Sequence, residues 1–124
     1  MPWNLDDDRP IYLQLMERIQ HDIVSGTYQP GDKLPSVRDL AAQAQVNPNT
    51  VQRALTELER EGLLVSGGTN GRTVTQEQSV LSAMRDEELQ ELARECLEKF
   101  RVFGLTPEQA ANLLLSFAEK KEES

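Results

Sequence analysis

Residues 34–64 read LPSVRDLAAQAQVNPNTVQRALTELEREGLL, a stretch that predicts two helices separated by a tight turn. Ser36 is a preferred cap for the first helix, and Asp39 follows three residues later, so both side chains can satisfy free amides. Asn47 is a preferred cap for the second helix, and Pro48 suits its first position because that amide has no partner there. The apolar positions have helical spacing: Val37, Leu40, Ala41 and Ala44, then Val51, Ala54, Leu55 and Leu58. Because so short a turn makes the helices cross steeply, the pattern predicts a helix-turn-helix.

A β-hairpin is predicted directly after the second helix. Gly62 ends that helix, and residues 63–66 and 72–75 are typical of two short strands around a turn at residues 67–71. Helix, turn, helix and hairpin together predict a winged helix, with Arg72 at the base of the wing.

Two segments of this region, PGDKLPSVRDLA (residues 30–41) and VNPNTVQRALTELEREGLL (residues 46–64), resemble the DNA-binding domain of the GntR family of bacterial transcription regulators. The resemblance is close over residues 9–75, and the size and pattern of the whole chain resemble the short YtrA-like subfamily. It implies a homodimeric repressor that binds an inverted-repeat operator, with control of transporter operons as its role. It also implies that Lys33 and Leu34 form a short strand beside the wing.

Candidate contacts with DNA gather at the starts of both helices and on the wing. The family counterpart of Arg38 contacts DNA. Short polar residues at the start of the second helix suit a phosphate, and Asn49 or Gln52 can pair with adenine. Arg53 suits a phosphate or the acceptor edge of guanine. The expected DNA-binding residues are Ser36, Arg38, Asn47, Asn49, Thr50, Gln52, Arg53, Gly71 and Arg72.

Local explanations compete with these roles. Asn47 and Asn49 are equally good as helix caps, and Arg38 is placed for a surface ion pair with Asp39 or Glu57. Many relatives carry a basic residue in the region of Pro48 or Gln52, or a second arginine in the wing, and this chain has neither. Its base preference therefore stays open.

The distribution of charge bears on DNA binding. The chain has a formal net charge of −8, whereas a basic face is expected of a nucleic-acid-binding domain. Residues 34–75 are neutral, because Arg38, Arg53, Arg60 and Arg72 balance Asp39, Glu57, Glu59 and Glu61. The excess acid lies in residues 6–8 and 76–124. We therefore expect weak nonspecific binding and specific binding that depends strongly on salt.

The rest of the chain divides into a tail and further helices. Residues 1–8 form an acidic tail that is either disordered or docked through Trp3 and Leu5, and residues 9–77 form the winged helix-turn-helix domain. A helix over residues 10–25 builds its core, with Ile11, Leu15, Ile19 and Ile23 spaced every four residues. Residues 78–124 are expected to form a helical hairpin, with one helix over residues 80–103 and a second that begins at Thr106-Pro107. The fold class is therefore mostly α.

The C-terminal hairpin is expected to make a homodimer. Its apolar surface is too large for the hairpin to stand alone, so pairing with a second copy is the economical arrangement. The alternative is a monomer in which both helices fold back on their own domain. The expected dimerisation residues are Leu89, Leu92, Cys96, Phe100, Phe103, Leu114 and Phe117.

Other functions find little support in the sequence. One cysteine and one histidine make neither a disulfide nor a metal site unaided, and GGTNGR lacks the Lys-Ser/Thr ending of a nucleotide loop. We expect no enzyme activity, no metal and no cofactor. The start of the chain has no signal peptide pattern, and the apolar runs are too short for a membrane span, so we expect a cytoplasmic protein. A winged helix that binds protein instead of DNA is the alternative function, and any effector is unknown.

Overall fold

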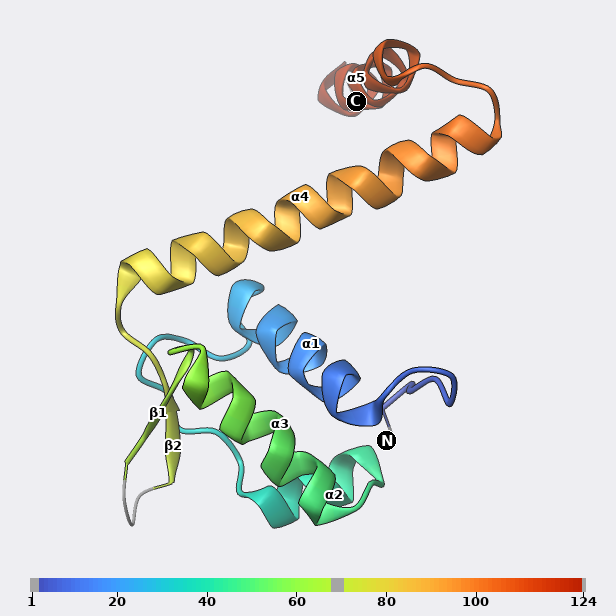
Figure 1. Cartoon of the computed structure of the whole chain (residues 1–124). Helices are drawn as coiled ribbons and strands as arrows, with labels where there is room; N and C mark the ends of the chain where they lie inside the picture. Colours follow the sequence, from blue (N-terminus) through green and yellow to red (C-terminus); the bar gives the residue numbers. More distant parts are fainter. Residues whose placement is uncertain (1–2, 68–70, 124) are drawn as a thin grey trace. The chain divides into compact units, whose positions relative to one another are not determined.

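The computed structural model describes residues 3–67 and 71–123, which form two compact units, Met1–Arg85 and Asp86–Ser124. The elements in chain order are α1 (Ile11–Val24), α2 (Val37–Ala44), α3 (Pro48–Arg60), β1 (Leu64–Ser66), β2 (Arg72–Val74), α4 (Gln78–Val102) and α5 (Pro107–Glu123) (Figure 1). The predicted fold class, mostly α with a winged helix-turn-helix, is confirmed. The division between the units falls inside α4, whereas the sequence placed a boundary between residues 77 and 78.

The core of the first unit lies between α1, α2 and α3 and extends under the hairpin. Leu15 and Ile19 of α1 are 2% exposed, and they share this core with Leu40, Leu55 and Leu58. The predicted four-residue repeat of α1 is thus confirmed, and the helix begins and ends one residue inside the predicted bounds. Because α3 buries one apolar stripe in this core, its opposite face is held outward.

The turn between α2 and α3 has the expected caps. Ser36 Oγ accepts a hydrogen bond from the Asp39 amide at 3.1 Å, and Asn47 Oδ1 accepts one from the Asn49 amide at 2.8 Å. Within the described residues the Asp39 carboxylate returns no bond to Ser36, because Asp is one methylene shorter than the Glu of a full capping box. Gln45 ends α2 in the left-handed conformation with a φ of 57°. The expected steep turn is therefore made without glycine.

The wing is an antiparallel pair in which Leu64 lies opposite Val74 and Ser66 opposite Arg72. The expected strand at Lys33 and Leu34 is present as a short pairing, since Lys33 bridges to Thr73 and the Leu34 amide donates to the Arg72 carbonyl at 2.9 Å. The chain before α2 is thereby fixed to the wing. Residues 68–70 of the predicted turn lie outside the described residues.

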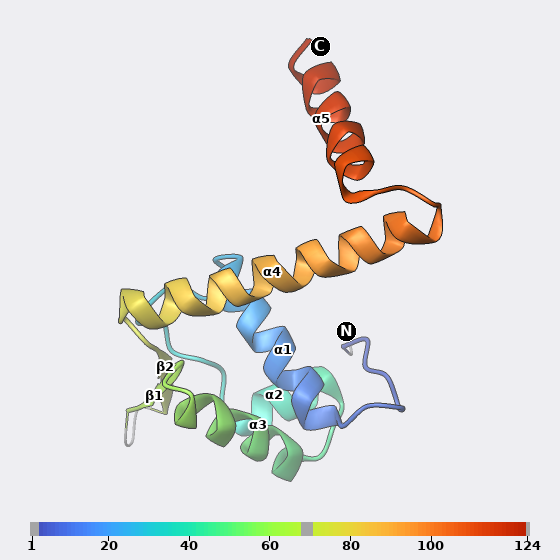
Figure 2. The same ribbon diagram turned by 45° about the horizontal axis from the view of Figure 1, so that its top comes forward.

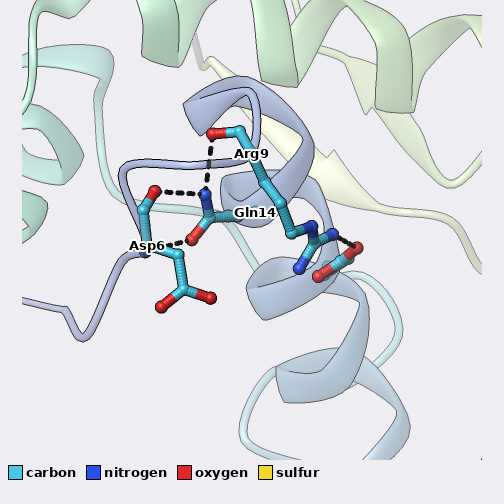
Figure 3. A network of polar contacts seen from close by, with 4 residues as sticks. Asp6, Arg9 and Gln14 are labelled. Carbon is cyan, nitrogen blue, oxygen red and sulfur yellow. Dashed lines mark hydrogen bonds and ion pairs between the residues drawn. The ribbon is translucent and has the colours of Figure 1, made fainter.

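The N-terminal tail is docked from Trp3 onward, which decides between the two alternatives. Gln14 of α1 is 7% exposed, and its amide closes a ring of bonds with the tail (Figure 3). Its Oε1 accepts from the Asp6 amide at 2.7 Å, while its Nε2 donates to the carbonyls of Asp6 at 2.8 Å and Arg9 at 3.0 Å. Trp3 and Leu5 pack against the core. Nothing in the sequence singles out Gln14, because one polar residue on a helix does not reveal its partners.

The second unit holds the C-terminal part of α4 and all of α5. Gly104 ends the first of these helices with a φ of 82°. A full capping box then starts α5: the Gln109 amide donates to Thr106 Oγ1 at 3.2 Å, and Gln109 Oε1 accepts from the Thr106 amide at 2.9 Å. Both the stop and the start were predicted.

The predicted antiparallel hairpin is wrong for the single chain. Within the second unit, α5 turns away from the end of α4 in both views (Figures 1 and 2). Among the described side chains of this unit, Ala110 alone is buried. A turn of a few residues permits an antiparallel hairpin, but it does not force two helices to pack when most of their apolar side chains stay exposed.

Candidate nucleic-acid interface

The start of α3 presents a polar face. Asn47 and Asn49 are exposed and Thr50 is half-buried, whereas Val51 is 2% exposed in the core. The local role expected for Asn47 is confirmed, because its side chain caps the helix. In the described part of the chain, no hydrogen bond occupies the side chain of Asn49 or of Gln52, which is exposed one turn later. These two amides are available to donate to a ligand and to accept from it.

Arg53 lies on the side of α3 that faces α1. Its guanidinium carbon is 3.7 Å from the centre of the Tyr12 ring, while the side chain stays exposed. Tyr12 belongs to the first turn of α1 and packs against the core. Nothing in the sequence points to Tyr12, because a stacking partner 41 positions away leaves no periodic signal.

Arg38 is exposed in the first turn of α2. The suggested ion pair with Asp39 or Glu57 is wrong, since neither carboxylate pairs with Arg38 within the described residues. Glu57 instead lies 3.1 Å from Arg60, one turn further along α3. An i,i+3 partner on the same helix is reached without ordering a second element. The positive charge of Arg38 therefore faces solvent.

The wing presents its arginine differently. Arg72 forms an ion pair with Glu59 at the end of α3, and the two side chains are 20% and 28% exposed. Glu59 was counted as a charge in the sequence, but its partner on the wing was missed. The contact neutralises Arg72 and ties β2 to α3. Gly71 is exposed beside it.

Residues distant in sequence meet at a hollow between the wing and the start of α2. The hollow has a volume of about 420 Å³, and its wall includes Lys33 and Ser36 on one side and Gly71 and Arg72 on the other. Three of these four residues were predicted DNA contacts, and Lys33 was expected only as part of a strand. The structure thus places two groups of predicted contacts in the first unit, at the start of α3 and around this hollow.

The described residues contain no group of three His, Cys, Asp or Glu side chains close enough to hold a metal ion. Among the helices described, none is both long and apolar enough to cross a bilayer.

The succession of α2, α3, β1 and β2 defines a winged helix-turn-helix protein. Residues 11–74 match the gntR family of bacterial regulatory proteins. The chain therefore belongs to the GntR family and is a transcription regulator, not an enzyme.

Two similar proteins match the chain over different lengths. The HTH-type transcriptional regulator YhcF of Bacillus subtilis is 34% identical over 111 residues, which cover 90% of this chain and 92% of YhcF. The HTH-type transcriptional repressor YtrA of the same organism is 51% identical over 55 residues, 44% of this chain and 42% of YtrA. The predicted resemblance to the GntR family and to YtrA-type regulators is confirmed.

Two solved structures are also similar. A GntR family transcriptional regulator from Listeria monocytogenes superposes with a TM-score of 0.77 at 32% identity and covers 94% of this chain and 98% of its own. The DNA-binding domain of AraR, solved in complex with operator ORX1, has a TM-score of 0.53 at 30% identity and covers 60% of this chain and 92% of its own.

Proposed function

We propose that this protein binds a two-fold symmetric DNA operator as a homodimer and represses transcription in the cytoplasm. The observation that carries the proposal is the outward polar face of α3, a helix whose opposite face is fixed in the core. Exposed Asn49 and Gln52 suit base edges in the major groove, and Arg38 suits a backbone phosphate. A complex of the similar AraR domain with its operator supports this use of the fold.

The wing supplies the second group of proposed contacts. Gly71 and Arg72 lie across the hollow from Ser36, so a DNA backbone that follows α2 would meet all three residues. Exposed glycine backbone allows close approach. The wing of this chain carries one arginine within its described residues, so we assign it a smaller share of the affinity than α3.

The second unit is proposed as the dimerisation part. Leu92 is 60% exposed, Phe103 is 82% exposed and Phe117 is 63% exposed, and large apolar side chains exposed together mark an interaction surface. A second copy is the partner we favour, because a two-fold dimer presents two recognition helices about 34 Å apart, one turn of DNA. Cys96 and Phe100 are half-buried beside this surface, and Leu89 and Leu114 extend it.

The sign of regulation is proposed from the relatives. YtrA of Bacillus subtilis, 51% identical over the matched residues, is named a repressor. An operator bound by such a dimer would exclude polymerase from an overlapping promoter, which requires no further domain.

Selection of bound sequences from random duplex DNA tests the proposal. The wild type is compared with Arg53→Ala at two salt concentrations, and Arg94→Ala serves as control because Arg94 is an exposed arginine paired with Glu91 on α4. We expect an enriched inverted repeat for the wild type and the control, weaker binding at the higher salt, and a weaker but measurable enrichment for Arg53→Ala. No enrichment for the wild type at low salt contradicts DNA binding and leaves the protein-binding winged helix as the function.

Dimerisation is tested separately by sedimentation. Leu92→Glu should shift the chain from dimer to monomer, because a charge in an apolar interface has no partner. Leu115→Glu is the matched control: the exposed fraction of Leu115, 59%, is close to that of Leu92, but Leu115 is not among the expected dimerisation residues. Equal sedimentation of Leu92→Glu and wild type would contradict the proposed interface.

A further inference from the structure

We propose that Tyr12 is a positioning residue for DNA recognition and acts by holding the guanidinium of Arg53 in a fixed orientation at the edge of α3. The inference rests on the proposed DNA binding and adds to it a residue of α1, a helix with no predicted DNA contact. Its direct basis is the stacking contact of 3.7 Å between the Arg53 guanidinium carbon and the Tyr12 ring centre.

The ring is the fixed partner of this pair. Tyr12 is half-buried and packs against the core, and α1 packs against α3 through that core. Arg53 is exposed on the neighbouring helix. The flexible Arg53 side chain therefore stacks on a Tyr12 ring that the core keeps in place. Its guanidinium loses rotational freedom before any ligand binds.

Stacking leaves the donors of Arg53 available. A guanidinium stacks through its face, whereas its five N–H donors lie in the plane and point outward from the edge. Within the described residues no carboxylate pairs with Arg53, in contrast to Arg72, which is occupied by Glu59. The positive charge and the edge donors can therefore meet a phosphate or the acceptor edge of guanine, with part of the ordering cost already met in the free protein.

A second arginine stack, between Arg18 of α1 and Trp3 of the tail, serves as an internal control. The Arg18 guanidinium lies 4.9 Å from the Trp3 ring centre, but its Nε also lies 3.3 Å from Asp22 Oδ2. This pair joins α1 to the N-terminal tail and includes no residue of α3. Removal of the Trp3 ring therefore tests whether the loss of any arginine stack on α1 is enough to weaken DNA binding.

The experiment measures the affinity of the full chain for its selected inverted-repeat duplex by fluorescence anisotropy. Tyr12→Leu should weaken binding about two- to five-fold, the range for an exposed cation–π contact. Tyr12→Phe should keep most of the affinity because it keeps the ring, and Trp3→Leu should leave it unchanged. Arg53→Lys keeps the charge, loses the planar stack and should weaken binding to a similar extent, without any change in the core around Tyr12.

A double-mutant cycle separates positioning from packing. In the Arg53→Ala background, Tyr12→Leu should cause no further loss, because Tyr12 then has nothing to position. Equal weakening by Tyr12→Leu in both backgrounds, or equal weakening by Tyr12→Phe and Tyr12→Leu, overturns the inference. If the wild type binds and Tyr12→Leu matches it, this inference alone fails. If the wild type binds no duplex, the proposed function fails and the role of Tyr12 fails with it.

Discussion

The two compact units use their leucines in opposite ways. In the first unit Leu58 of α3 is fully buried, and it belongs to a core shared by three helices and the hairpin. In the second unit Leu92 of α4 is 60% exposed, and Ala110 is the one buried side chain among those described there. Since burial of apolar area is the main favourable term in folding, the first unit has its own source of stability, whereas the second leaves most of its described apolar side chains exposed.

The largest effect expected from this difference is on matched leucine substitutions. Leu58→Ala should lower the free energy of unfolding by about 2–5 kcal/mol, because it removes buried atoms and leaves a cavity. Leu92→Ala should change it by less than about 0.5 kcal/mol at protein concentrations low enough to favour the monomer. Urea unfolding followed by circular dichroism measures both. Equal losses would show that α4 is covered within the single chain.

A smaller effect is expected at the tail, which extends the core of the first unit. Gln14→Ala should cost about 1–3 kcal/mol of stability, because it removes three hydrogen bonds made by a buried amide. Trp3 is the single tryptophan of the chain, so its fluorescence reports release of the tail. Unchanged fluorescence in Gln14→Ala would mean that Trp3 and Leu5 hold the tail without the amide. Gln20→Ala, on the same helix, is the control.

The helix caps of the two units can be compared in the same way, and we expect loss of a cap to cost about 1 kcal/mol of stability. Asn47→Ala removes the cap of α3 and should lower the stability of the first unit by roughly 1 kcal/mol. Thr106→Ala removes half of the capping box of α5 and should increase hydrogen exchange in α5 without moving the unfolding transition of the first unit. A shift of that transition in Thr106→Ala would mean that the two units unfold together.

The smallest effect concerns pH and the last turn of α4. A hydrogen bond from Arg101, together with its positive charge, lowers the pKa of Glu98 below its ordinary value. A lowered pKa in the folded state means that this contact stabilises the helix above the ordinary pKa of Glu, about 4.3, and is lost as the pH falls through the lowered value. NMR titration of Glu98 should show the shift in the wild type and its absence in Arg101→Ala. An equal titration midpoint in both proteins would show that the exposed pair is not maintained in solution.

The sequence predicts most of what is local in this fold. The caps at Ser36, Asn47 and Thr106 follow from residue preferences over three or four positions, and the elements they start are present. The β-hairpin of β1 and β2 follows from its pattern of strand and turn residues, and the buried face of α1 follows from its four-residue repeat. The misses are contacts between different segments of the fold: Gln14 with the tail, Tyr12 with Arg53, and Glu59 with Arg72. None of these pairs has a spacing rule, because each depends on how whole elements pack.

In the second unit the helices and the turn at Gly104 were predicted, but the antiparallel packing predicted for the two helices does not match the single chain. Apolar spacing tells which residues of α4 and α5 need cover, and it does not tell whether the cover is the neighbouring helix or another chain. The proposed dimer interface therefore depends on the sedimentation experiment, whereas the winged helix follows from the chain itself.

The ion pair between Arg72 and Glu59 has a consequence for the ionic atmosphere of DNA. A solvent-exposed arginine that binds a phosphate releases about one condensed counterion, which makes binding more sensitive to salt. Glu59 already holds the Nε of Arg72, so a phosphate that meets the remaining N–H donors of Arg72 finds a positive charge that a carboxylate has partly offset. A phosphate that instead displaces Glu59 leaves that negative charge beside the DNA, where it draws a cation from solution in place of the one released. We expect the wing to add little to the entropy gained from counterion release. Arg38 and Arg53 should supply most of that entropy.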